Sequence, residues 1–285
     1  MNWIISSAIM YISSVALYLL VRKSSKLGNP SQFNNLAMFF VPLIILLAVD
    51  SSTNQNFMLS VSHFVVIILA GILFSYLGNV FSLISIELAP NPGYSLVISK
   101  SYVVFTTLVA VLFFQAELTL KKAVAIAIIV GFSGLIMLSQ KALNKTKNKL
   151  WLPLAIGAFF CWGLLSLTSK YLFNQGVSVY AFLTYAYITV SLCIVFEMLK
   201  KRISFGIIRK DPVNFLLIGL FSTGFNFFLF EAIRTSPNVG YVNAINASSI
   251  SAVTILAIIL FKDEFSKIKF IGILGVTFGL LLLLI

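Results

Sequence analysis

The sequence predicts an all-α membrane protein whose ten transmembrane helices form two inverted five-helix repeats. The first observation behind this prediction is composition. Hydrophobic residues make up 60% of the 285 residues and charged residues 10%, which leaves too few polar side chains to cover a soluble globule. The second is the length of the apolar runs, about twenty residues, which suits a membrane-spanning helix better than the shorter strand of a barrel. The third is an internal duplication.

Apolar runs separated by polar or helix-breaking residues place five spans in each half of the chain. The predicted spans cover about residues 3–21, 33–49, 62–87, 92–114, 120–139, 151–173, 177–199, 213–232, 237–261 and 267–285. A Lys-rich hydrophilic stretch separates the fifth span from the sixth. We therefore predict a first repeat over residues 1–140, a basic linker loop over 141–150 and a second repeat over 151–285.

The duplication is visible when the sequence is shifted by 147 positions. Phe74–Lys122 then superimposes on Phe221–Lys269 without a gap, and the pattern Pro-Asn-x-Gly-Tyr occurs at residues 90–94 and again at 237–241. This pattern is informative, whereas matches among Leu, Ile and Phe are common in so apolar a chain. Because each repeat has an odd number of spans, the second must enter the membrane from the opposite side. Inverted repeats are typical of carriers that alternate access to one midplane site.

In these features the chain resembles the EamA-like branch of the drug/metabolite transporter superfamily over nearly its whole length. The features are Pro90 and Pro237 between the third and fourth spans of each half, Glu-containing turns at 116–119 and 263–266, and glycines in the fifth and tenth spans. The small-residue spacing from Gly275 to Gly279 in the tenth span predicts close helix packing. The resemblance implies a metabolite transporter with its cavity between the third and fourth helices of each half.

Lys100 is the first candidate for substrate binding. It lies about eight residues into the fourth predicted span, near mid-membrane by helical rise. A cation there costs about 2.5–3.5 kcal/mol and needs a partner or watery surroundings. One interpretation is a counter-charge for a carboxylate or phosphate on the substrate. The other is a structural pair with an internal acid, or a lysine that extends to the interface. The repeat places Ala247 opposite Lys100, so this charge belongs to one half only.

Four asparagines extend the predicted substrate site. Asn79 and Asn226 occupy matching positions in the two repeats, and this symmetry favours a shared role in packing helices together. Asn243 and Asn246 are three residues apart on one face of the ninth span, as helical periodicity requires. For this second pair substrate binding and packing stay equally open, because an amide in lipid needs a partner of either kind.

Two aromatic residues, Trp162 and Tyr102, have polar neighbours within their spans and are further candidates for lining the substrate site, with packing as the simpler interpretation. We predict no metal site and no cofactor. Cys161 and Cys193 fall inside apolar runs without metal-ligand spacing, and His63 is the sole histidine. Such isolated cysteines are typical of packing residues.

The net charge of +12 indicates membrane orientation, and we predict no nucleic-acid partner. Loops on one side of the predicted topology hold fifteen Lys and Arg residues, and loops on the other side hold four. The positive-inside rule then puts the first set in the cytoplasm and both termini outside, whereas the resemblance implies cytoplasmic termini. The predicted location is a multi-pass integral membrane protein, in the cytoplasmic membrane if the chain is bacterial.

We therefore expect a secondary transporter that moves a small anionic or zwitterionic, amino acid-like metabolite by alternating access. Its predicted partners are this small-molecule substrate and the lipid bilayer, with the coupling ion left open and the chain either a monomer or a homodimer. A flippase for a lipid-linked sugar or phosphate is the alternative within transport. A structural or accessory membrane protein is the alternative of another class. We predict no enzymatic activity, because no two acids converge at mid-depth as a catalytic set would require.

Overall fold

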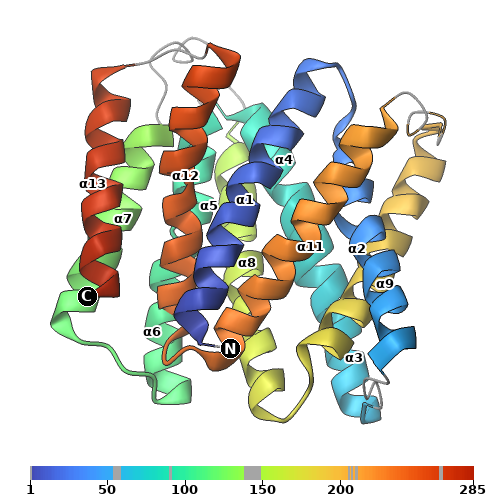
Figure 1. The fold of residues 1–285 in the computed structure, drawn as a ribbon, viewed down its shortest axis with the longest axis horizontal. Helices are drawn as coiled ribbons and strands as arrows, with labels where there is room; N and C mark the ends of the chain where they lie inside the picture. Colours follow the sequence, from blue (N-terminus) through green and yellow to red (C-terminus); the bar gives the residue numbers. More distant parts are fainter. Residues whose placement is uncertain are drawn as a thin grey trace. The chain divides into compact units, whose positions relative to one another are not determined.

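A computed structural model of the chain describes residues 2–53, 59–89, 92–137, 149–204, 206, 208, 211–262 and 266–285. Helices are the regular elements throughout these residues, and no strand occurs among them (Figure 1). The all-α class predicted from the sequence is therefore confirmed for this part of the chain.

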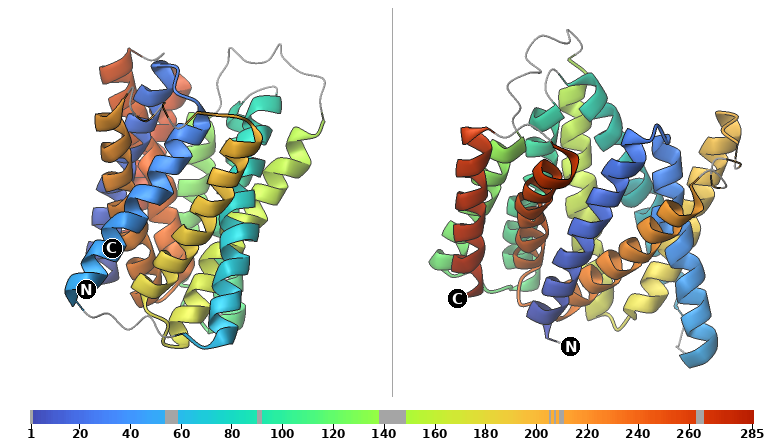
Figure 2. Two further views of the ribbon diagram at one scale, coloured as in Figure 1. Left: turned by 90° about the vertical axis from the view of Figure 1, so that its right-hand side faces the viewer. Right: turned by 45° about the horizontal axis from the view of Figure 1, so that its top comes forward.

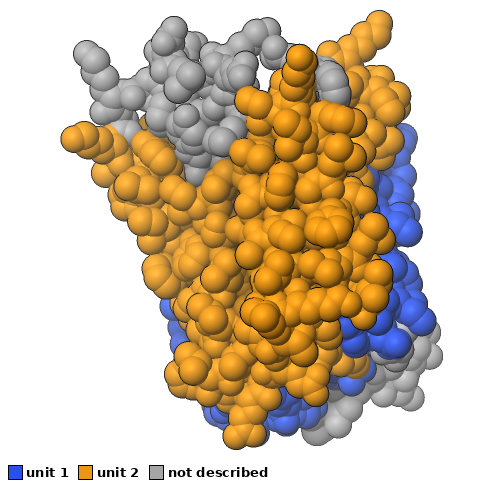
Figure 3. Space-filling model, turned by 90° about the vertical axis from the view of Figure 1, so that its left-hand side faces the viewer, with its two compact units in different colours: residues 1–76, 171–234 blue, residues 77–170, 235–285 orange. Residues whose placement is uncertain are grey.

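The chain divides into two compact units, which Figure 3 colours separately. Unit 1 comprises residues 1–76 and 171–234, and unit 2 comprises residues 77–170 and 235–285. Each unit takes helices from both predicted sequence repeats. The repeats and the compact units are thus different divisions of the chain, and the division into repeats stays a prediction.

The helices are assigned to the units as follows. Unit 1 contains α1 (Trp3–Lys26), α2 (Ser31–Thr53), α3 (Val61–Leu69), the π-helix η1 (Ala70–Tyr76), α9 (Val179–Lys200) and nearly all of α11 (Pro212–Thr235). Unit 2 contains α4 (Leu77–Leu88), α5 (Pro92–Lys100), α6 (Tyr102–Phe114), α7 (Leu120–Met137), most of α8 (Trp151–Asn174), α12 (Val239–Phe261) and α13 (Lys267–Leu284).

Within the described residues, nine helical segments are long and apolar enough to cross a membrane. Two of these segments join shorter elements: α3, η1 and α4 form one, and α5 and α6 form another. The helix predicted as the fifth span, α7, is not among the nine, and it ends where the described residues end. Ten spans and their inverted arrangement therefore remain predictions, as does the linker over residues 141–150, of which 141–148 lie outside the described residues.

Side-chain caps explain where several of the helices begin. The backbone N–H groups in the first turn of a helix have no intrahelical acceptor, and an Asn or Ser side chain just before the helix supplies one. Asn2 accepts from the backbone N–H of Ile4 at 3.0 Å at the start of α1. Ser178 accepts from Ala181 N–H at 3.1 Å at the start of α9, and Ser266 caps α13 in the same way.

Glycines allow two helices of unit 2 to pack closely. Helices α7 and α13 lie side by side in Figures 1 and 2. A Cβ added at Gly272 would lie 3.0 Å from the backbone oxygen of Phe132, and one added at Gly279 would lie 2.8 Å from the Ile129 side chain. Gly275 faces the Phe132 ring still more closely. The close contact predicted from the glycine spacing is confirmed.

Aromatic contacts form much of the interior of unit 1. Helices α2 and α9 pack against each other, and the rings of Phe39 and Tyr187 meet edge to face with centroids 5.9 Å apart. Phe33 of α2 meets Phe215 of α11 at 5.3 Å in the same manner. These edge-to-face geometries are the favoured ones for aromatic pairs, and they fix α9 and α11 around α2.

The third predicted span, residues 62–87, is not one uniform α-helix. Its middle is the π-helix η1, which follows α3 and precedes α4. A Cβ added at Gly71 in η1 would lie 3.2 Å from the Thr189 side chain of α9. A single π-helical turn inside an α-helix inserts a residue and is frequent at functional sites. Hydropathy could not reveal it, because the inserted residue leaves the run equally apolar.

The fourth predicted span, residues 92–114, is also interrupted. α5 ends at Lys100 and α6 begins at Tyr102, with Ser101 between them in a turn. The Ser101 hydroxyl donates to the carbonyl of Val97 at 2.7 Å, and the Ser101 N–H is shared between the carbonyls of Val97 and Ile98. A serine that bonds back to the carbonyl four residues earlier competes with the helical ladder and bends the helix.

Candidate functional site

Lys100 occupies the last position of α5, beside the interruption at Ser101. Its side chain is half-buried. A lysine at a helix C-terminus is stabilised by the partial negative charge of the last carbonyl groups. Interrupted membrane helices expose such terminal groups within the bilayer, and transporters use them to bind solutes and ions. The structure therefore places the predicted counter-charge at a helix end, which the sequence did not indicate.

Helix α6 begins just after Lys100 and involves two of the predicted site residues. Tyr102 is its first residue, and Asn243 of α12 forms a hydrogen bond to the helix. Tyr102 is buried in the first turn of α6, one turn before Thr106. The Asn243 amide nitrogen donates to Thr106 Oγ1 at 3.1 Å, which links α12 to α6. Asn243 is fully buried, and its amide oxygen finds no hydrogen-bond partner among the described residues. The amide nitrogen of Asn243 thus joins two helices, whereas its amide oxygen can still accept a hydrogen bond.

Asn246 follows Asn243 by one helical turn on α12 and is 8% exposed. Residues three apart lie on the same side of a helix, so the two amides extend along one side of α12 in unit 2. Lys100, Tyr102, Asn243 and Asn246 therefore all belong to α12 or to the interrupted span α5–α6. Those two segments contain most of the polar residues that the sequence proposed.

Trp162 lies at a contact between α4 and α8, and Asn79 follows the α4 residue that makes this contact. Gly78, the neighbour of Asn79, faces α8 so closely that an added Cβ would lie 2.9 Å from the Cβ of Cys161 and 3.9 Å from the Trp162 ring. Both Asn79 and Trp162 are half-buried. The burial of Cys161 in this contact agrees with the packing role expected for it.

Asn226 belongs to unit 1, unlike the six other predicted site residues. Its amide nitrogen donates to the backbone carbonyl of Ser222 at 3.0 Å and to the Ser222 hydroxyl at 3.1 Å. The Ser222 hydroxyl in turn donates to the carbonyl of Met38 at 2.8 Å. Asn226 is thus part of a hydrogen-bonded link between α11 and α2, the packing role that its symmetric position in the sequence favoured.

The Pro-Asn-x-Gly-Tyr pattern at residues 237–241 has a structural explanation in unit 2. Asn238 accepts from the N–H of Gly240 at 2.8 Å, which caps α12, and donates to the carbonyl of Glu117 at 3.2 Å. The Tyr241 hydroxyl donates to the same carbonyl. Lys122 lies over the Tyr241 ring, 4.7 Å from its centre. Asn238 and Tyr241 of the pattern therefore bind the turn between α6 and α7 to α12 through the backbone carbonyl of Glu117. The matching pattern at 90–94 includes Pro90 and Asn91, which lie outside the described residues.

Three hydroxyl residues on α9 went unnoticed in the sequence. Thr184, Tyr187 and Ser191 are 3%, 3% and 5% exposed, and their hydroxyl groups find no hydrogen-bond partner within the described part of the chain. The spacing of three and four residues puts them on one face of the helix. That spacing was readable beforehand, but hydroxyl residues are so common in membrane helices that spacing alone gave no reason to select them. We call these three residues the hydroxyl stripe.

Glu197, near the end of α9, is a second residue that was not predicted from the sequence. Its carboxylate accepts hydrogen bonds from Gln32 of α2 at 3.1 Å, from Tyr76 of η1 at 3.1 Å and from Lys201 at 2.7 Å. Hydrogen bonds to a charged acceptor are stronger than neutral ones. Glu197 thus holds the start of α2 and the end of the π-helix against α9. In the sequence it was only one acid beside a basic loop.

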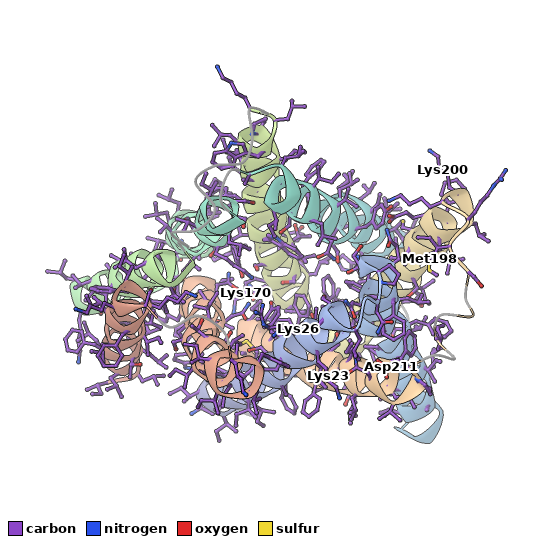
Figure 4. The ribbon with its side chains drawn as sticks, turned by 90° about the horizontal axis from the view of Figure 1, so that it is seen from above. Lys23, Lys26, Lys170, Met198, Lys200 and Asp211 are labelled. Carbon is purple, nitrogen blue, oxygen red and sulfur yellow. The ribbon has the colours of Figure 1, made fainter. Side chains whose placement is uncertain are left out.

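Basic residues also lie at this end of unit 1, and Figure 4 labels Lys23, Lys26 and Lys200 in a view from above. Lys23 and Lys26 lie in the last turn of α1, and Lys200 ends α9. The amide of Asn29 donates to Asp211 at 3.3 Å, which links the connection after α1 to the start of α11. This is the end of unit 1 that the positive-inside rule assigns to the cytoplasm, an assignment that stays a prediction.

Nine apolar helices among the described residues make this an integral, multi-pass membrane protein. Residues 149–285 match the sequence model of the EamA-like transporter family. The second half of the chain is thus similar to the EamA-like transporters, and the resemblance noted in the sequence is confirmed over these residues.

Comparison with other proteins adds the fold but no further identity. No curated protein matches the chain. In structure, 29 chains match. One of them, described only as "Crystal structure of protein", has a TM-score of 0.76 and 11% sequence identity, over 98% of this chain and 96% of that one. At so low an identity the likeness establishes a shared fold alone.

Proposed function

We propose that this protein is a secondary transporter that moves a small anionic or zwitterionic, amino acid-like metabolite across the membrane by alternating access. The match of residues 149–285 to a transporter family supports transport. The observation that carries the finer proposal is Lys100, a half-buried cation at the point where a membrane-spanning segment is interrupted. A charge at that depth is costly unless it faces a partner or water, and in this proposal Lys100 is the counter-charge for an anionic group of the substrate.

The neighbouring polar groups of unit 2 support the same proposal. The amide oxygen of Asn243 has no partner within the described residues, so it can accept a hydrogen bond from an ammonium or hydroxyl group of the substrate. A lysine on α5 and an amide acceptor on α12 together supply groups complementary to the two ends of a zwitterion. Asn246, one turn further along α12, extends this polar surface. Tyr102, two residues after Lys100, is buried, and in this proposal its ring lines the same site.

Alternating access follows, in this proposal, from the two sequence repeats over residues 1–140 and 151–285. Their odd number of spans gives them opposite orientations in the membrane. Two similar bundles of opposite orientation exchange roles when one rocks against the other, so that an outward-open state becomes an inward-open one. The gapless alignment of Phe74–Lys122 on Phe221–Lys269 supports this arrangement.

Solute counterflow tests the proposed substrate class. Purified protein is reconstituted into liposomes loaded in turn with unlabelled anionic, zwitterionic, uncharged and cationic metabolites, and entry of the matching radiolabelled solute is followed. We expect transient accumulation of at least one anionic or zwitterionic solute, and none in protein-free liposomes. Accumulation confined to cationic or uncharged solutes would contradict the role given to Lys100. Movement of lipid-linked sugars alone would favour a flippase.

A further inference from the structure

The hydroxyl stripe lies deep in unit 1. Tyr187 is the ninth residue of α9, which has 22 residues, so it lies about 12 Å from the start of a helix about 33 Å long. Thr184 and Ser191 are about 4.5 Å and 6 Å from it along the axis. All three side chains are more than nine-tenths buried. The stripe is thus a row of hydroxyl groups near mid-depth, with one aromatic residue at its centre.

The hydroxyl groups of this stripe differ from most others in the protein. Buried Ser and Thr side chains in membrane helices usually donate to a carbonyl three or four residues earlier. Thr189, also on α9, does so to Tyr185 at 2.8 Å, and Thr223 of α11 does so to Gly219 at 2.9 Å. Thr184 and Ser191 make no such bond within the described residues. An unpaired buried hydroxyl costs about 1–3 kcal/mol, which native proteins avoid by supplying water or another partner.

The two groups that the structure shows beside Tyr187, at the centre of the stripe, are uncharged. The Phe39 ring of α2 packs against Tyr187. The Tyr187 hydroxyl lies toward the Asn226 amide of α11, but makes no hydrogen bond of normal geometry with it. The nearest acid along α9 is Glu197, six residues beyond Ser191 and so about 9 Å further along the axis, and it is already bonded to three donors.

We infer that the hydroxyl stripe, with Asn226 and Phe39, is a binding subsite for an uncharged hydrogen-bonding group, such as an amide or a hydroxyl on an apolar carbon chain. Each hydroxyl both donates and accepts, so the row matches a group that does the same. A charged group would lose its hydration without gaining an opposite charge. The inference rests on the proposed function in one respect, that the bound molecule is a transported amino acid-like solute.

Cysteine labelling tests the subsite without knowledge of the substrate. Thr184→Cys, Ser191→Cys and the control Thr189→Cys are made in a protein whose two native cysteines, Cys161 and Cys193, are replaced by alanine. Labelling by methyl methanethiosulfonate is timed in liposomes. We expect the first two thiols to react at least about tenfold faster than the control, since reaction requires access to the thiol. Equal, slow labelling at all three positions would show that the stripe is closed packing and would overturn the inference.

Matched ligands test the chemical class. Thermal unfolding of the wild type is measured with L-glutamine against L-glutamate, and with L-threonine against L-valine. We expect L-glutamine and L-threonine to give the larger increase in midpoint. Thr184→Val and Ser191→Ala should remove the difference, and Thr189→Val should keep it. A larger increase in midpoint with L-glutamate or L-valine would overturn the proposed class of ligand. So would a difference in midpoint that persists in Thr184→Val and Ser191→Ala.

The two proposals fail in distinguishable ways. If no amino acid changes the midpoint, the amino acid-like substrate is wrong, and with it the assigned ligand class, whatever the labelling pattern. If counterflow of an amino acid is observed but Thr184→Cys and Ser191→Cys label no faster than Thr189→Cys, transport stands and the subsite is wrong.

Discussion

Replacement of Lys100 by alanine is expected to abolish measurable uptake while the protein still folds. Removing one partner of a buried charge pair costs about 2–5 kcal/mol, which is about thirtyfold or more in affinity. The substrate that the wild type accumulates in counterflow would then no longer bind at the concentrations used. Initial uptake rates over a range of substrate concentrations measure the effect, with the thermal midpoint as the measure of folding.

Three further variants show whether the loss comes from the charge. Lys100→Met keeps the length of the side chain without its charge and should behave like alanine. Lys100→Arg keeps the charge and should retain part of the uptake. Lys149→Ala removes the same charge from an exposed position before α8 and should transport normally. Uptake by Lys100→Met at the wild-type rate would exclude Lys100 as the counter-charge.

Replacement of Gly240 by alanine is expected to destabilise unit 2 substantially. A Cβ at this position would lie 2.8 Å from the Cα of Thr107 and closer still to the Thr107 side chain, so α12 and α6 would have to separate. Overpacking of this kind costs about 1–3 kcal/mol and occasionally more. The separation would also strain the hydrogen bonds from Asn238 and Tyr241 to Glu117. Thermal unfolding in detergent measures the effect.

Gly131 provides the matched control for this prediction. It is an exposed residue of α7, and a Cβ added there meets no atom within 4 Å. Gly131→Ala should leave the midpoint unchanged or raise it slightly, since alanine is favoured over glycine in a helix by about 1 kcal/mol. If Gly240→Ala is as stable as Gly131→Ala, the close contact between α12 and α6 is not a constraint on the fold.

Most of the span positions could be predicted because they depend on local hydropathy. The span expected at about 237–261 is α12, Val239–Phe261, and Asn238 before it is a helix-capping residue by type alone. The packing around Gly275 also followed from spacing. These features depend on residues that are close together in the sequence, so a single sequence suffices to predict them.

The features that the sequence did not reveal depend on which helices meet. Ser101 interrupts its span, whereas Ser249 bonds back to Asn246 inside an unbroken helix, and nothing local separates the two serines. Thr184 and Thr189 are both buried threonines of α9, yet only Thr189 uses its hydroxyl within the helix. Glu197 has three donors because Gln32 and Tyr76, far away in sequence, lie beside it.

The most direct test of the central claim, that the charge of Lys100 serves transport, is chemical restoration of that charge. Lys100→Cys is prepared without the two native cysteines and should be inactive. Modification with 2-aminoethyl methanethiosulfonate attaches an ammonium group of lysine-like length, and uptake should return. Methyl methanethiosulfonate attaches no charge and should leave the variant inactive. Uptake by unmodified Lys100→Cys at the rate of its Lys100 parent, restoration by both reagents, or restoration by neither would contradict the account.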